Sequence, residues 1–168
     1  MNRIRQVADI IEFVVIYHPQ GLRILSGEVP PPSSSELADI IAPFQDQSKE
    51  NERVDLTPLG HAPQESLIFK ADKIDEILDY AGGWERIVTA AKEYRKSFPQ
   101  SWAIFVDHVV WIDSMRGHSR LQESQMRNLS IKHNVSESTI RRRRQEVPRA
   151  IARAAVLAPV AGWKLGEY

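Results

Sequence analysis

Residues 129–144 read LSIKHNVSESTIRRRR, a turn-forming stretch between an apolar segment and four consecutive arginines. In the tight turn of a helix-turn-helix, the chain leaves the first helix through a residue in the left-handed conformation. Glycine adopts that conformation most readily and asparagine next. Asn134 stands at this position, four residues after the small Ser130, which would lie where the two helices cross. The spacing therefore predicts two helices joined by a tight turn.

The residues after Asn134 fit the start of the second helix. Val135 can seal the turn, and Ser136 can cap the helix by accepting a hydrogen bond from the backbone N–H of Thr139. Ile140 would then anchor the helix to the core. These features favour a helix-turn-helix over an ordinary helical hairpin with a basic second helix, which is the alternative.

Two positions depart from the usual pattern of this motif. His133 stands where an apolar residue is common, and Arg143 stands three residues after Ile140, where another core residue is common. Both side chains are long enough to reach solvent from the seam between the helices.

Each residue of the second helix can be placed around its axis, because successive residues turn by about 100°. The side opposite Ile140 would enter the major groove of DNA, where arginine suits guanine and glutamine suits adenine. The residues predicted to approach base edges are Glu137, Ser138, Arg141, Arg142 and Gln145. The residues predicted to contact phosphates are Arg120, Arg127, Lys132, Ser136, Thr139, Arg143 and Arg144.

Charge is unevenly distributed along a chain whose formal net charge is zero. Residues 116–153 contain ten of the 22 basic residues and three of the 22 acidic ones, and residues 36–79 contain eleven acidic residues and four basic ones. This asymmetry indicates a polyanion-binding segment attached to a body that does not bind polyanions. The acidic segment is expected to be a solvated surface; alternatively, it contacts RNA polymerase or screens the basic helix.

The predicted fold is mainly α. Residues 1–25 form a helix or a small hairpin, residues 26–70 a proline- and serine-rich, acidic linker, residues 71–158 an all-α domain, and residues 159–168 a tail. Within the domain, Gly82-Gly83 and Pro99 end helices, and the apolar 101–113 segment is the buried central helix. Pro148 is expected to kink or divide the last helix after Val147.

Composition narrows the classes of protein further. The chain has no cysteine, which excludes disulfides and thiolate metal sites, and its early apolar run is interrupted by Glu12 and too short to span a bilayer. We therefore expect a cytoplasmic protein. His108, His118 and His133, with Asp107 and Asp113, match no metal-ligand spacing. No enzymatic activity, cofactor or metal is expected.

The sequence LSIKHNVSESTIRRRR resembles the helix-turn-helix of bacterial and phage regulators related to region 4 of sigma factors. The wider span from about 71 to 155 is similar to phage late-gene transcription regulators of the ArpU/RinA type. The resemblance implies a sequence-specific regulator that binds double-stranded DNA through residues 136–145, and a homodimer on paired half-sites is expected. Phage small terminase subunits carry similar motifs and are the alternative. A further alternative is a non-catalytic module that binds acidic proteins.

Overall fold

The described part of the protein consists of helices and the turns that join them. The computed structural model describes residues 2–50, 70–114 and 122–157. The mainly helical class is confirmed, because these residues form eight helices and no strand. The helices are α1 (Arg3–Tyr17), α2 (Gly21–Leu25), α3 (Ser34–Glu50), α5 (Ala71–Tyr80), α6 (Trp84–Ser97), α7 (Pro99–Ser114), α8 (Gln122–His133) and α9 (Glu137–Leu157).

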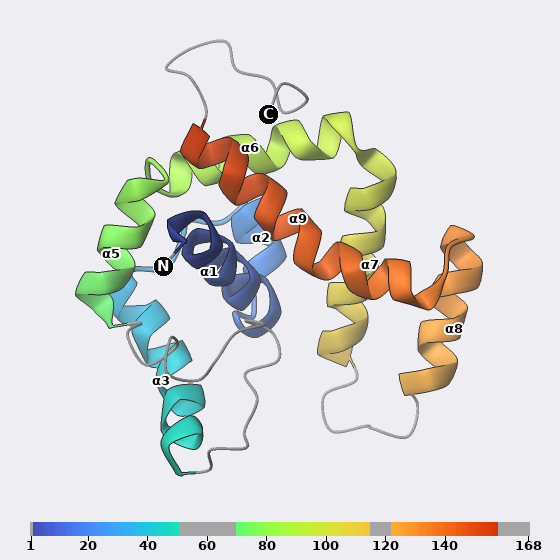
Figure 1. The fold of residues 1–168 in the computed structure, drawn as a ribbon, viewed down its shortest axis with the longest axis horizontal. Coiled ribbons are helices and arrows are strands. Elements are labelled where there is room, and N and C mark those ends of the chain that lie inside the picture. The colour runs from blue at the N-terminus through green and yellow to red at the C-terminus, as the bar shows by residue number, and fades with distance from the viewer. Residues whose placement is uncertain (1, 51–69, 115–121, 158–168) are drawn as a thin grey trace.

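Helix α1 lies near the centre of the fold, where α2, α3, α5, α7 and α9 contact it (Figure 1). The Asn2 side chain caps it by accepting hydrogen bonds from the N–H groups of Ile4, at 2.9 Å, and Arg5, at 3.3 Å. Every residue from 6 to 16 is buried, as expected of a helix surrounded on all sides. The prediction that 101–113 is the central helix is therefore wrong: α7 lies at the side and leaves Val110 54% exposed.

The N-terminal segment is helical, so the hairpin alternative is wrong. Residues 13–17 form the end of α1, and residues 22–25 belong to α2. The two helices meet closely at Gly21, where an added Cβ would lie 2.2 Å from the carbonyl oxygen of Val14. A side chain there would force α2 away from α1, so this turn requires glycine.

Helix α3 forms in a segment that the sequence assigned to a linker. The Ser33 hydroxyl accepts a hydrogen bond from the N–H of Glu36, at 3.2 Å, and so caps the helix. Leu37 and Ile41, one turn apart, are buried against the core. Burial of this apolar stripe and the cap at Ser33 stabilise a helix despite the polar composition of the segment. The prediction of a linker is therefore wrong for residues 34–50. Residues 51–69 lie outside the described part.

The two breaks predicted on either side of α6 are found. Gly82 and Gly83 have φ of 84° and 86°, and the N–H of Gly83 donates to the carbonyl of Leu78 at 2.9 Å. This pairing ends α5 in the way that left-handed glycines commonly end helices. Helix α6 ends at Ser97, and Pro99 begins α7, where its missing N–H costs nothing.

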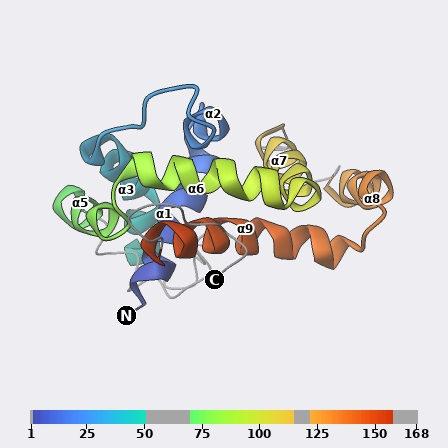
Figure 2. The same cartoon turned by 90° about the horizontal axis from the view of Figure 1, so that it is seen from above.

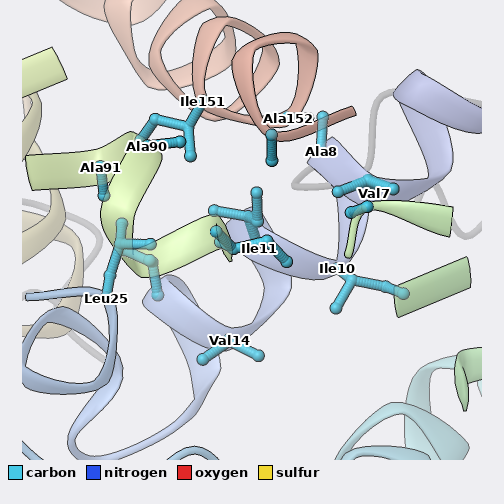
Figure 3. Close-up of a cluster of buried hydrophobic side chains, with 14 of the residues drawn as sticks. Val7, Ala8, Ile10, Ile11, Val14, Leu25, Ala90, Ala91, Ile151 and Ala152 are labelled. Carbon is cyan, nitrogen blue, oxygen red and sulfur yellow. The ribbon is translucent and has the colours of Figure 1, made fainter. Parts of the chain in front are cut away.

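One apolar core joins α1, α2, α3, α5, α6, α7 and α9. Figure 3 shows Ala8 of α1, Ala90 and Ala91 of α6 and Ala152 of α9 among larger side chains such as Ile151. The small residues allow the helix backbones to approach closely while isoleucines fill the space between them. The core therefore unites residues from three of the predicted segments, 1–25, 26–70 and 71–158.

Helix α9 is continuous through Pro148, so the predicted division after Val147 is wrong. Proline removes one backbone hydrogen bond from a helix, but the surrounding packing compensates here. Val147, Pro148 and Ile151 are buried, and α9 packs along α1, α6 and α7. At 1.5 Å per residue, its 21 residues extend about 31 Å, from α8 at one end of the molecule towards α5 at the other (Figures 1 and 2).

Candidate nucleic-acid interface

The turn between α8 and α9 has the geometry that the sequence predicts for it. Asn134 is the only described residue other than glycine with a positive φ, at 54°. The N–H of Val135 donates to the carbonyl of Ser130 at 3.1 Å, and the Ser130 hydroxyl donates back to the carbonyl of Val135. These reciprocal bonds close the turn, because they satisfy backbone groups that the end of α8 would otherwise leave unpaired.

Ser136 caps α9 as predicted. Its hydroxyl oxygen accepts a hydrogen bond from the N–H of Thr139 at 3.1 Å. It also lies 3.0 Å from the hydroxyl of Ser138 and 2.9 Å from that of Thr139. The hydroxyls of Ser136 and Thr139, both predicted to contact phosphates, thus bond within the cap, where they stabilise the start of the helix.

A second, smaller core holds the two helices against α7. Ile104 of α7, Met126 of α8 and Ile140 of α9 are buried together. Trp111, Leu129 and Val135 pack around them. Ile140 is fully buried, as predicted for the anchor of α9. The candidate interface is therefore a three-helix unit in which α7 supports α8 and α9.

Two polar contacts fix the end of α8 to α7. Asp107 Oδ2 lies 2.7 Å from His133 Nε2 and 2.8 Å from Lys132 Nζ. Partial burial by itself would raise the pKa of Asp107, but the hydrogen bonds from Lys132 and His133 lower it overall. His133, the first departure from the usual pattern, is thus accommodated because α7 offers it a carboxylate.

His108 of α7 is a buried residue that contacts the start of α9. It is buried and hydrogen-bonded to the backbone of Ile140. Burial, with the positive charges of Arg144 and Arg141 nearby, lowers its pKa to about 4. His108 is therefore neutral near pH 7 and acts as a structural residue behind the helix.

The face of α9 opposite Ile140 is accessible. Ser138, Arg141 and Arg142 are exposed, and Glu137 and Gln145 are half-buried. All five residues predicted to approach bases lie on the first two and a half turns of the helix, directly after the turn. Ser138, Arg142 and Gln145 thus lie on the side of α9 opposite Ile140, with Arg141 beside them, whereas Glu137 lies nearer the buried side.

The residues predicted to contact phosphates are more scattered. Arg127 is exposed, Lys132 reaches Asp107, and Arg143 pairs with Glu146. Arg120 lies outside the described residues. Arg144 turns inward, because its side chain is only 19% exposed and its Nε lies 3.7 Å from Oε1 of Glu12. The side chain of Arg144 is therefore directed towards Glu12 and away from solvent, which does not favour the phosphate contact predicted for it.

Glu12 and Arg144 link the centre of the fold to the candidate interface. Glu12 lies on α1 and is 5% exposed, and its Oε1 has no hydrogen-bond partner. Burial raises its pKa to about 8, Arg144 and Arg149 oppose this, and Asp9 adds to it. Sequence reasoning missed this residue, although a glutamate inside an apolar run was a signal that it has a buried partner.

The described acidic residues of the segment 36–79 lie away from the turn between α8 and α9. Helices α3 and α5 carry the described part of the acidic segment and pack on each other. Figures 1 and 2 place them at the end of the molecule opposite α8. The positions of the described acidic residues therefore do not favour the alternative in which this segment screens the start of α9.

Two negative findings concern other classes of site. Among residues 2–50, 70–114 and 122–157, no group of three or more histidine, aspartate or glutamate side chains could hold a metal ion. No helix in this part of the chain is long and apolar enough to cross a membrane.

The chain was compared with known protein families, curated proteins and solved structures. None of the three comparisons finds a match.

Proposed function

We propose that the protein is a sequence-specific regulator of transcription that binds double-stranded DNA through α8 and α9, and that it derives from a phage or prophage. The observation that carries the proposal is the exposed arginine face of α9, held in a fixed direction by the turn at Asn134 and the buried Ile140. An ordinary solvated helix does not need such a turn. The resemblance of residues 129–144 to the helix-turn-helix of ArpU/RinA-type and sigma region 4-like regulators supports the same conclusion.

In this proposal, the first turns of α9 enter the major groove. Arg141 and Arg142 donate to guanine O6 and N7, and Gln145 bonds to adenine. Ser138 and Glu137 contact neighbouring base edges. Arg127, from α8, binds the phosphate backbone and positions the helix.

A single unit of this size makes few base contacts, so we expect a homodimer on two half-sites about one helical turn of DNA apart. RNA polymerase is the further partner expected of a transcription regulator. The exposed carboxylates of α5 and the described carboxylates of α3 lie on the side away from the proposed DNA contact, where they would be accessible to a protein partner.

The test is selection of binding sequences from a random duplex library, followed by titration of the selected and scrambled duplexes at 50–200 mM salt. We expect a defined motif and an affinity that falls steeply with salt, because arginines displace counterions from phosphates. Failure to enrich any sequence, or no DNA binding at 50 mM salt, would refute the proposal. The mass of the protein in solution adds a second criterion: a dimer fits a regulator, whereas a large ring indicates a small terminase subunit.

A further inference from the structure

A hollow of about 370 Å³ lies between α6 and the second half of α9. Its polar rim includes Arg149 and Arg153, and its apolar surface comes from Tyr94, Phe98, Ala150 and Ala154. Phe98 is 44% exposed, and its ring lies 5.1 Å from that of Tyr94. The hollow therefore combines two cations with an aromatic surface open to solvent.

The two arginines of the hollow are available to an external anion. Both are exposed, and neither forms an ion pair with another described residue. The one acidic residue of the rim, Glu146, is already paired with Arg143. The residues that line the hollow thus carry a net positive charge.

These arginines lie on the same side of α9 as Arg142, one of the residues proposed to read DNA. Arg142, Arg149 and Arg153 follow one another at intervals of seven and four residues, which places them within about 40° around the helix axis. This alignment depends on the continuity of α9 through Pro148. A helix divided there, as the sequence suggested, would not keep the three side chains in phase.

The distances between these arginines along α9 are comparable to the width of the major groove of DNA. At 1.5 Å per residue, Arg149 lies about 10 Å beyond Arg142, and Arg153 about 16 Å beyond it. The major groove is about 12 Å wide. When Arg142 lies over the base edges, the two later arginines reach the edge of the groove, where the phosphates run.

We propose that the hollow between α6 and α9 binds the sugar–phosphate backbone at the edge of the groove that α9 enters. Arg149 and Arg153 contact successive phosphates, and Phe98 packs against a deoxyribose. This site rests on the proposed function, but it adds an anchor outside the helix-turn-helix and extends the contact over most of α9.

The first experiment measures how salt affects the binding of the selected duplex by the variant Arg149→Gln/Arg153→Gln. Loss of two phosphate contacts should reduce the slope of log affinity against log salt by about 2, while the preference for the selected over the scrambled duplex stays unchanged. The matched control is Arg23→Gln/Lys73→Gln, which removes two positive charges from α2 and α5. Its slope should equal that of the wild type. Circular dichroism and the melting temperature establish that both variants fold.

The second experiment locates the contact on the DNA. Single phosphates of the selected duplex are replaced in turn by neutral methylphosphonates. The wild type should lose about tenfold in affinity at one or two positions beside the recognised bases, and Arg149→Gln/Arg153→Gln should lose nothing further there. Phe98→Ala should weaken both duplexes equally.

An unchanged salt slope, an equal reduction in the control, or a changed base preference would overturn this site. So would methylphosphonate losses that persist in the double variant. The wild-type titration separates this outcome from failure of the proposed function. If the wild type binds all duplexes alike and the double variant still lowers the slope, the regulator proposal fails and the backbone site stands; if the wild type binds no duplex, both fall.

Discussion

Replacement of Glu12 by glutamine tests whether ionisation of this buried carboxyl group lowers the stability of the protein. Glu12 is buried on α1 opposite Arg144, and burial raises its pKa from 4.5 to about 8. Between these two values, the unfolded chain releases the proton and the folded chain retains it. The folded state is therefore stabilised by this group at low pH and loses that stabilisation as the pH rises to about 8. Glutamine has the shape of the protonated acid but cannot ionise.

The magnitude follows from the two pKa values. A tenfold change in proton affinity corresponds to about 1.4 kcal/mol, so a rise from 4.5 to about 8 corresponds to at most about 5 kcal/mol. Relaxation of the structure around a buried charge reduces such costs. We expect Glu12→Gln to match the wild type near pH 4 and to be more stable by about 2–5 kcal/mol above pH 8.

The assay is urea unfolding of both proteins from pH 4 to pH 9, with the difference in unfolding free energy plotted against pH. The control is Glu28→Gln, which removes an exposed partner of Arg23 and should shift stability by no more than about 1 kcal/mol at any pH. A wild type more stable than Glu12→Gln at pH 9 would refute the reasoning, because the ion pair with Arg144 would then outweigh the cost of burial.

Three further outcomes are expected. In urea unfolding, Asn134→Gly should keep the wild-type stability within about 0.5 kcal/mol, and Asn134→Ala should be less stable by about 1–2 kcal/mol. The reason is that glycine adopts the left-handed φ of 54° readily and alanine does not. Equal stabilities of the two variants would contradict this. The pKa of His108 should lower the free energy of unfolding by up to about 3 kcal/mol as the pH falls from 6.5 to about 4. In this range the ring binds a proton in the unfolded chain but stays neutral in the folded one. His108→Gln should lack this acid-side loss, and parallel curves would show that the loss arises elsewhere. In DNA binding, Arg142→Ala should cost about 1–3 kcal/mol on the selected duplex and relax base preference, whereas Arg127→Ala should weaken all duplexes alike and reduce the salt slope by about 1. Uniform loss in both variants would mean that Arg142 reads no base.

Much of the α8–α9 unit could be predicted because its determinants are local. The left-handed conformation of Asn134 and the cap at Ser136 depend on the residue itself and on backbone groups within three or four positions. The same holds for the end of α5 at Gly82-Gly83. The exposed face of α9 follows from the position of its anchor, Ile140, and the regular turn of a helix.

The predictions that failed depend on partners distant in the sequence. The segment 34–50 has a linker-like composition, yet Leu37 and Ile41 find the core and make it a helix. Pro148 breaks isolated helices, yet packing against α1 and α6 keeps α9 continuous. In each case, apolar burial outweighs a local preference of a few kcal/mol.

The sequence by itself determined the helical class, the turn at Asn134 and the concentration of positive charge near it, because backbone preferences and helical spacing act over a few residues. Only the tertiary structure decided which arginines of α9 are exposed. Arg142 and Arg144 stand two positions apart in the chain, but Arg142 is exposed and Arg144 is partly buried. The difference arises because α9 packs against α1, which places Glu12 next to Arg144. The sequence shows where charged residues stand in the chain, but their exposure depends on which segments pack over them.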